Sequence, residues 1–261
     1  MNCTFAALAV LLATAAAAVA DDKPPVKIIW HGQSFFEVVS SQGTRVVFDP
    51  QAIEAFGRIA IPHADLILMS HLHSDHTQVD VVDDYKKVKT YNALKDVKGD
   101  GRRIEFVPVD DSIKDVKFHN VSAYHDNAEG MIRGRNGIWV VEMDGLRIVH
   151  LGDLGHMLSD EQLKQIGPVD VLMIPVGGVY TLNGTDAKKV IEQLKPKRCI
   201  LPMHYGIPHV FEDLLPLDEF LDGVKPQVIK RFDATNELTI DPASPAPLEP
   251  LIAILSWKKP S

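Results

Sequence analysis

The run HLHSDH at 71–76 constrains this chain more than any other feature, because it follows the apolar segment 65–69 directly. A short segment that is apolar nearly throughout is typical of a strand covered on both faces. Residues two apart in an extended chain point the same way, so the imidazoles of His71 and His73 can reach one ion. The last two residues of the run add a carboxylate and a third imidazole where the chain turns. The run therefore predicts a metal site at the end of a buried strand.

Short apolar segments bounded by turn residues predict a protein rich in β-strands. The predicted strands lie at 26–30, 34–39, 45–48, 65–69, 137–143, 146–150, 169–175 and 198–202. Asp144-Gly145 joins two of them and predicts a tight hairpin, because both central positions of that turn need φ > 0. The predicted helices lie at 159–165, 186–194 and 212–221, and the Pro-rich stretch 242–250 predicts a surface loop. Strands in runs with interspersed helices indicate a mixed α/β sandwich in one domain.

The first residues have the composition of a signal peptide. Residues 5–20 carry no charge and end in Ala18-Val19-Ala20, a small-x-small pattern that signal peptidase cleaves. We therefore expect a signal peptide at 1–20 and a single mature domain at 21–261. Such a protein is secreted or periplasmic and has no stable membrane anchoring after cleavage. An uncleaved anchor is the alternative, since the residues before the apolar run supply only the α-amino charge.

Charge and cysteine content narrow the class of partner. The formal net charge is −8 and there is no long basic run, which argues against nucleic acid because phosphate contacts need clustered Lys and Arg. We therefore expect a small-molecule substrate. Of the two cysteines, Cys3 would leave with the signal peptide, and Cys199 stands in an apolar segment where a small buried hydrophobe is expected. The sequence leaves the oligomeric state open, including a homo-oligomer.

Five segments in the same order resemble the motifs of the metallo-β-lactamase fold superfamily. They are Asp49 in VVFDP, the run at 71–76, His125 in AYHD, Asp153 in HLGD and His204 in PMHYG. The resemblance spans about residues 26–206. It implies an α/β fold, a four-layer αββα sandwich of two mixed β-sheets.

The resemblance also implies two divalent metal ions and a set of residues that hold them. The first ion would be bound by His71, His73 and His125, the second by Asp75, His76 and His204, with Asp153 bridging both. Imidazole and carboxylate ligands suit zinc, which we expect, and also manganese or iron. Asp49 is expected to support ligand histidines from behind, where a carboxylate fixes the imidazole tautomer. His150 fits the branch pattern described next and is expected in a similar supporting role.

Within the superfamily, the chain is most similar to the branch that contains L-ascorbate-6-phosphate lactonase. The matching stretches are 28–35 (IIWHGQSF), 174–178 (IPVGG) and 202–206 (PMHYG). The branch usually has His where this chain has Gln33, and an amide is neither acid nor base near neutral pH. Lactonase chemistry is therefore not assumed.

Four further residues are candidates to bind substrate. His31 lies two positions before Gln33 and is a candidate to take over part of the missing histidine's role; a histidine satisfied at a strand end is the alternative. Tyr180 and Thr181 lie in a loop after a predicted strand, and a plain surface loop is the alternative there. His156, three residues after Asp153, is a candidate at the mouth of the pocket.

These residues predict a metal-dependent hydrolase. A hydroxide shared by two ions would attack an ester, lactone or phosphodiester bond of a small molecule. Asp75 and Asp153 would orient the hydroxide or move its proton. A β-lactamase would lack the bridging Asp153, a ribonuclease would want a basic surface, and di-iron redox relatives usually carry Glu where His73 stands. The remaining alternative is a metal-binding protein without catalytic activity, although all seven ligand positions are filled.

Overall fold

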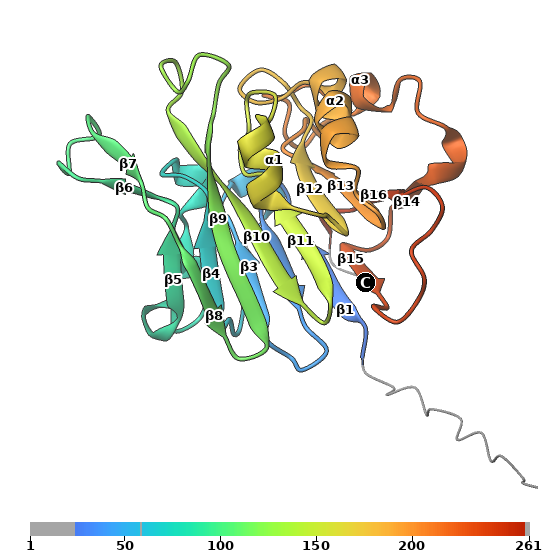
Figure 1. Ribbon diagram of the computed structural model, residues 1–261, viewed down its shortest axis with the longest axis horizontal. Helices are drawn as coiled ribbons and strands as arrows, with labels where there is room; N and C mark the ends of the chain where they lie inside the picture. Colours follow the sequence, from blue (N-terminus) through green and yellow to red (C-terminus); the bar gives the residue numbers. More distant parts are fainter. Residues whose placement is uncertain (1–23, 58, 259–261) are drawn as a thin grey trace, which may run out of the picture.

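The computed structural model, which describes residues 24–57 and 59–258, consists of two β-sheets packed face to face (Figure 1). The predicted signal peptide and Cys3 lie outside the described residues. No helix in the described part of the chain is long and apolar enough to cross a membrane. The predicted two mixed sheets are confirmed, and their strands are described in turn below.

The first sheet has six strands in the order β15-β1-β2-β3-β4-β5. Its strands are β1 (Val26–Trp30), β2 (Phe36–Val39), β3 (Arg45–Phe48), β4 (Leu66–Met69), β5 (Lys89–Asn92) and β15 (Glu237–Ile240). Strands β3, β4 and β5 run parallel, whereas the other neighbours are antiparallel. The sheet is therefore mixed, and the predicted metal-binding run leaves it from β4.

The second sheet has eight strands in the order β14-β16-β13-β12-β11-β10-β9-β8. Its strands are β8 (Asp110–Ile113), β9 (Val116–Tyr124), β10 (Arg135–Met143), β11 (Leu146–His150), β12 (Val171–Pro175), β13 (Cys199–Met203), β14 (Ile229–Phe232) and β16 (Leu251–Leu255). The predicted β10–β11 hairpin is confirmed, with φ of 50° at Asp144 and 77° at Gly145. Strands β6 (Leu94–Asp96) and β7 (Ile104–Phe106) form a separate ribbon.

The core lies between the sheets, and β4 shows why its segment is apolar nearly throughout. Leu66 and Leu68 belong to the large cluster between the sheets, together with Phe48 of β3 and Trp139 of β10. Ile67 faces the other way, into a smaller cluster on the outer side of the six-stranded sheet. Both faces of β4 are therefore buried, as the sequence predicts, and the end of the strand is held firmly.

The two outer layers differ in kind. Helices α1 (Asp160–Ile166) and α2 (Gly184–Leu194) cover the eight-stranded sheet, and α3 (Asp218–Leu221) packs on α2 (Figure 1). The outer side of the six-stranded sheet is covered, in the described residues, by segments that include the 3-10 turns η3 (Val79–Val81) and η4 (Tyr85–Lys87). The 3-10 turn η1 (Glu54–Phe56) instead packs through Phe56 on Phe211 and Trp257. The predicted outer layer on that side is thus present as turns and not as α-helices.

The C-terminal strands and the last helix depart from the sequence prediction. Strands β14, β15 and β16 were not predicted, yet they complete both sheets. The stretch 242–250 is an irregular connection between β15 and β16, as predicted. The helix predicted at 212–221 is wrong for its first half, because only Asp218–Leu221 is helical. Pro216 explains the late start, since proline lacks the donor that a helix interior requires.

Candidate metal centre

The histidine run is shaped by the turn that follows β4. After Met69 the chain bends through residues 70–73, and Ser74–His76 then forms the 3-10 turn η2. The turn returns His76 toward the sheet, where it is fully buried beside the buried His71. His73 stays exposed and lines a cavity. The apolar strand therefore presents three imidazoles at different depths.

The other predicted ligands come from the ends of strands in the eight-stranded sheet. His125 directly follows β9, Asp153 follows β11 and His204 directly follows β13. These three strands run in the same direction, because β10 is antiparallel to both of its neighbours and β11, β12 and β13 are parallel. Their carboxyl ends therefore lie at one edge, opposite the end of β4.

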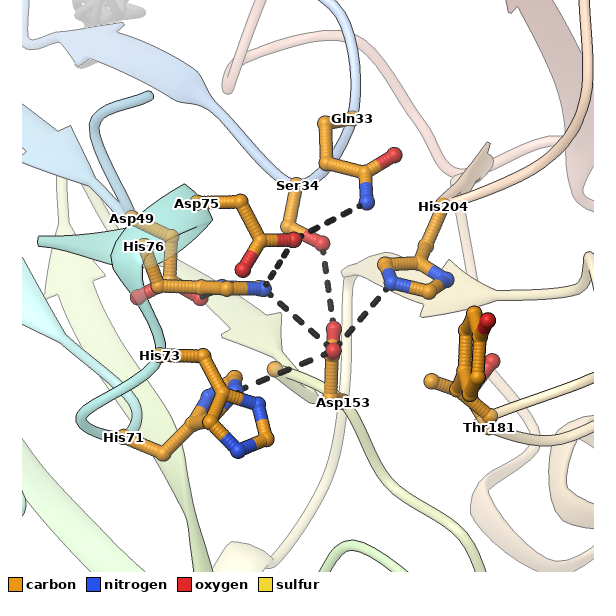
Figure 2. A network of polar contacts seen from close by, with 12 residues as sticks. Gln33, Ser34, Asp49, His71, His73, Asp75, His76, Asp153, Thr181 and His204 are labelled. Atoms are coloured by element: carbon orange, nitrogen blue, oxygen red, sulfur yellow. Dashed lines mark hydrogen bonds and ion pairs between the residues drawn. The ribbon is translucent and has the colours of Figure 1, made fainter. Parts of the chain in front are cut away.

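At this edge the imidazoles converge on a single carboxylate oxygen (Figure 2). The Oδ2 atom of Asp153 lies 3.1 Å from Nε2 of His125, 3.2 Å from His204, 3.3 Å from His76 and 3.8 Å from His71. One carboxylate cannot balance four imidazoles by hydrogen bonding alone, since each oxygen has few lone pairs. The cluster has the composition of a site for cations.

Three groups of ligand atoms are close enough to hold ions. Within each group the atoms lie within 4.8 Å of one another, and the groups are His71/His73/His125, His71/His76/Asp153 and Asp75/His76/His204. The first and third are the two sets predicted from the sequence, and Asp153 lies between them. The buried Nε2 of His76 has no hydrogen-bond partner among the described residues. An orphaned buried nitrogen of this kind suits a metal ligand, so the residues fit divalent metal ions.

Asp49 holds two of these histidines from behind. Nδ1 of His76 donates to Oδ2 of Asp49 at 2.9 Å. The hydroxyl of Ser70 donates to the same carboxylate at 2.7 Å and accepts from Nδ1 of His71 at 2.9 Å. The backbone N–H of Ser70 donates to the other oxygen of Asp49. With each Nδ1 carrying its proton, both Nε2 atoms face the site as acceptors. Nε2 of His71 lies 3.0 Å from Nδ1 of His73, whereas Nε2 of His76 has no hydrogen-bond partner among the described residues.

Two more supporting contacts come from the loops. Nδ1 of His125 donates to the backbone oxygen of Tyr180 at 3.1 Å, which again leaves Nε2 for the site. His150 does not touch a ligand histidine through a hydrogen bond. Its Nε2 donates to the backbone oxygen of Ser34 at 2.8 Å and its Nδ1 accepts from the N–H of Gly152. His150 therefore ties together the two loops that carry Ser34 and Asp153.

The electrostatics of the cluster follow from burial and charge. Burial lowers the pKa of His71, and the charge of neighbouring His76 lowers it further. Burial alone would also lower the pKa of His76, but the charges of Asp153 and Asp49 raise it well above its usual value. Burial would raise the pKa of Asp153, but His204 and His76 hold it well below its usual range. The cluster thus favours a positive charge between His76 and Asp153, the place where an ion would replace the proton.

Two residues near the carboxylates were not predicted as site residues. Nε2 of Gln33 donates to Oδ2 of Asp75 at 3.2 Å, and the hydroxyl of Ser34 donates to Oδ1 of Asp153 at 3.4 Å (Figure 2). Burial would raise the pKa of Asp75, but His76 and the Gln33 contact lower it. The replacement of a histidine by Gln33 was the sequence signal that pointed to this loop, although it did not reveal the partner.

A cavity of about 500 Å³ opens over the cluster. It is lined by His73, Asp75, His125, Ile132, Arg133, Asp153, Tyr180 and His204. The structure therefore brings Tyr180 to the site, and Thr181 lies next to it beside His204 (Figure 2). Ile132 and Arg133 carried no signal in the sequence, because they belong to a loop without a recognisable motif.

Two predicted substrate-binding residues do not reach the cavity. His31 lines a different cavity, and its Nε2 contacts the buried Glu37. His156 is not among the residues that line the cavity over the cluster. Its Nδ1 donates to the backbone oxygen of Met157 and its Nε2 accepts from the N–H of Tyr124. The placement of His31 favours the alternative of a satisfied structural histidine.

The chain is similar to known proteins along most of its length. Residues 27–204 match the family described as the beta-lactamase superfamily domain. A UPF0173 metal-dependent hydrolase of Thermococcus onnurineus is 32% identical over 194 residues, covering 69% of this chain and 85% of the relative. A crystal structure from Thermotoga maritima, of a candidate zinc-dependent hydrolase of the metallo-β-lactamase superfamily, is 30% identical. Its TM-score is 0.65, with 88% of this chain and 98% of that chain covered.

A more distant structure shares the fold alone. It is a candidate metal-dependent hydrolase from Parabacteroides distasonis, 22% identical with a TM-score of 0.57, covering 77% of this chain and 89% of its own. Two mixed sheets with a cluster of histidines and carboxylates at their shared edge define the metallo-β-lactamase fold. The chain belongs to the beta-lactamase superfamily and is, with its relatives, a metal-dependent hydrolase.

Proposed function

We propose that this protein uses two divalent ions, zinc in the first place, to hydrolyse an ester, lactone or phosphodiester bond of a small molecule. The observation that carries the proposal is the convergence of four imidazole nitrogens on Oδ2 of Asp153. The groups on either side of this oxygen contain the ligand types that zinc, manganese and iron prefer. Iron and manganese are therefore the alternatives to zinc.

Asp153 and Asp75 have different tasks in the proposed reaction. Two divalent ions bound here would lower the pKa of a shared water toward neutrality and polarise the substrate oxygen. Asp153 is buried and touches both groups of imidazoles, so its charge offsets the repulsion of two cations. Asp75 is partly exposed, with 32% of its side chain accessible, and lines the cavity. Its ionised carboxylate, held by Gln33, is placed to orient water or accept a proton.

The alternative of a metal-binding protein without activity is less well supported. A purely structural ion site is closed by its ligands, whereas a catalytic one keeps an open position. Here His73, Asp75, Asp153 and His204 all line a cavity of about 500 Å³ that is large enough for a small substrate. The open cavity therefore favours catalysis.

Elemental analysis combined with a substrate panel tests the proposal. The protein as purified, and after reloading with zinc, manganese or iron, should contain two ions per chain. His76→Ala should remove mainly one ion and His71→Ala should weaken binding of the other. The reason is that His71 belongs to the group His71/His73/His125, whereas His76 belongs to the group Asp75/His76/His204. Hydrolysis of a generic ester, a lactone and a phosphodiester is then measured in the best metal. One ion at saturation would contradict the dinuclear site, and metal binding without any turnover would favour the non-catalytic alternative.

We also propose that the protein is exported after cleavage behind Ala20, on the strength of the small-x-small pattern before it. The N-terminal sequence of protein purified from its native host tests this. Asp21 at the N-terminus of secreted or periplasmic protein is the expected result. An intact Met1 on protein inside the cell would contradict it.

A further inference from the structure

Arg133 supplies the guanidinium that lines the cavity over the metal centre. In the described chain it forms no salt bridge, whereas Arg45, Arg147 and Arg198 each lie beside a carboxylate. Its presence is notable in a protein with a net charge of −8. A cation that has no carboxylate of its own, placed beside the predicted reaction centre, is available to a negatively charged ligand.

The guanidinium of Arg133 is held in place on one side only. Its Nη2 donates to the backbone oxygen of Val179 at 3.0 Å, and its Cζ lies 5.2 Å from the ring centroid of Tyr180. A guanidinium over an aromatic face is stabilised by the cation–π interaction. Only one of its five N–H groups is used by these contacts. The others suit the two oxygens of a carboxylate or phosphate, which arginine binds in a bidentate manner.

The loop that carries Arg133 is built on a neighbour of a predicted metal ligand. Asp126, which follows His125, is buried and accepts four backbone N–H groups, from Ala128, Gly130, Ile132 and Arg133. The loop is therefore fixed relative to His125, as the positioning of a binding group requires.

Apolar side chains surround the guanidinium at the mouth of the cavity. Exposed fractions are 84% for Met131, 66% for Ile132, 50% for Val179 and 48% for Tyr180. Ile132 and Tyr180 also line the cavity itself. Large apolar side chains gathered beside a binding site indicate that the ligand covers them. The mouth therefore offers one cation and a surrounding apolar surface.

We propose that Arg133, Ile132 and Tyr180 form a subsite that selects amphipathic anions. The substrate then carries a carboxylate or phosphate and an apolar group close to the bond that is cleaved. The inference rests on the proposed hydrolase function and adds the chemical class of its substrate.

The affinity of the metal-loaded protein for phenylphosphonate, measured by calorimetry, tests the subsite. Arg133→Gln should bind phenylphosphonate about tenfold more weakly or worse, because the hydrogen bonds between the guanidinium and the charged phosphonate are lost. Arg135→Gln is the matched control: it loses the same charge two positions along the chain, but Arg135 is exposed and lies over Tyr124, outside the cavity. The control should stay within about twofold of wild type, as exposed charges contribute little.

Two further binding measurements separate the contribution of the ligand's apolar group from that of its anionic group. Ile132→Ser should weaken phenylphosphonate and leave methylphosphonate unchanged, since only the first covers the apolar surface. Benzoate in place of phenylphosphonate distinguishes a carboxylate from a phosphate. Equal affinities in wild type, Arg133→Gln and Arg135→Gln would show that the ions alone bind the anion and would overturn the proposal. So would the lack of measurable binding to wild type.

Hydrolysis and binding together distinguish the two proposals. If wild type cleaves nothing in the substrate panel but Arg133→Gln still binds phenylphosphonate more weakly than wild type, the hydrolase proposal fails and the anion subsite stands. If wild type is active and Arg133→Gln binds the probe normally, the subsite is wrong and the hydrolase proposal stands. Circular dichroism and metal content confirm that every variant is folded and loaded.

Discussion

Two buried clusters in this protein use the same residue types for different ends. In the metal centre, Asp153 faces four imidazole nitrogens, and one of them, Nε2 of His76, has no hydrogen-bond partner in the part of the chain that the structure describes. On the outer face of the six-stranded sheet, buried Glu37 contacts Nε2 of His31 and the guanidinium of Arg45. The second cluster is complete, because one carboxylate meets one imidazole and one permanent cation.

The difference shows what marks a functional histidine. A histidine whose two ring nitrogens both contact backbone groups is structural, as the buried His150 and the half-buried His156 are. A buried histidine held at Nδ1 and free at Nε2, like His76, is prepared for an external ion. Residue type and burial do not separate the two kinds, whereas the pairing of each nitrogen does. Four substitutions test this distinction.

Asp153→Asn should have the largest effect. The amide keeps the shape of the side chain but loses the charge that offsets two cations, so hydrolysis should fall on the order of a hundredfold or more. Folding should survive, because the β10–β11 hairpin carries the local packing. Turnover, metal content and circular dichroism are measured on the one variant. A wild-type rate would refute the bridging role and leave Asp153 as a turn residue.

Asp49→Asn should have the next largest effect. Asp49 touches no substrate, but it fixes the proton on Nδ1 of His76 and orients Ser70 behind His71. Loss of such a partner typically lowers metal affinity or activity by roughly 10- to 100-fold. Metal affinity from a competition titration is the direct measure. An unchanged affinity with reduced thermal stability would show that Asp49 serves the fold alone.

Glu37→Gln should affect stability and spare the reaction. Burial would raise the pKa of Glu37, but His31 and Arg45 lower it overall. A carboxylate with a lowered folded pKa stabilises the protein above its unfolded pKa of about 4.3, and this contribution is lost as the pH falls. In Glu37→Gln the free energy of unfolding at pH 7 should drop by about 2 kcal/mol. This loss is smaller than that expected for breaking a fully buried ion pair, because Arg45 is partly exposed. The difference in unfolding free energy between wild type and Glu37→Gln should narrow below about pH 4.

Urea unfolding at several pH values measures this gap, and metal content is the control. Metal content should match wild type, because Glu37 faces away from the centre. A loss of bound metal in Glu37→Gln would show that the two clusters are not independent.

His156→Asn should have the smallest effect. The variant loses two hydrogen bonds to the backbone, each worth about 1 kcal/mol at most in a partly exposed position. Catalytic efficiency should stay within about twofold of wild type, since no ring nitrogen is left for substrate. A selective rise in KM at unchanged thermal stability would restore the predicted role at the mouth of the pocket.

The sequence predicted those parts of the structure that short-range patterns encode. Many strands with apolar residues on one or both faces, such as β4 and β11, were found, and so were the residues that end them, although the apolar β16 and the long β9 were missed. Strands β5, β8 and β14 were not, because their exposed residues show little apolar pattern. The helix predicted at 212–221 failed at Pro216. Side-chain direction was the other limit, because nothing in the sequence shows that His31 turns toward Glu37.

The same limit explains the site residues that were missed. Gln33 and Arg133 reach the centre through loops whose course depends on distant contacts. The position of Arg133 follows from four backbone hydrogen bonds to Asp126, a pattern that no spacing rule reports. The residues that cluster at the centre could therefore be predicted from motifs, whereas the shape of the cavity could not.

The contact between Ser34 and Asp153 joins residues 119 positions apart in the chain. His150 makes a similar link to the Ser34 loop across 116 positions. Contacts of such high sequence separation form late in folding, because a large loop must first close, which lowers the entropy of the chain. Both sheets must therefore be in register before the centre exists. Metal occupancy is in consequence a gauge of the whole fold, and a fragment that lacks either sheet has no site to fill.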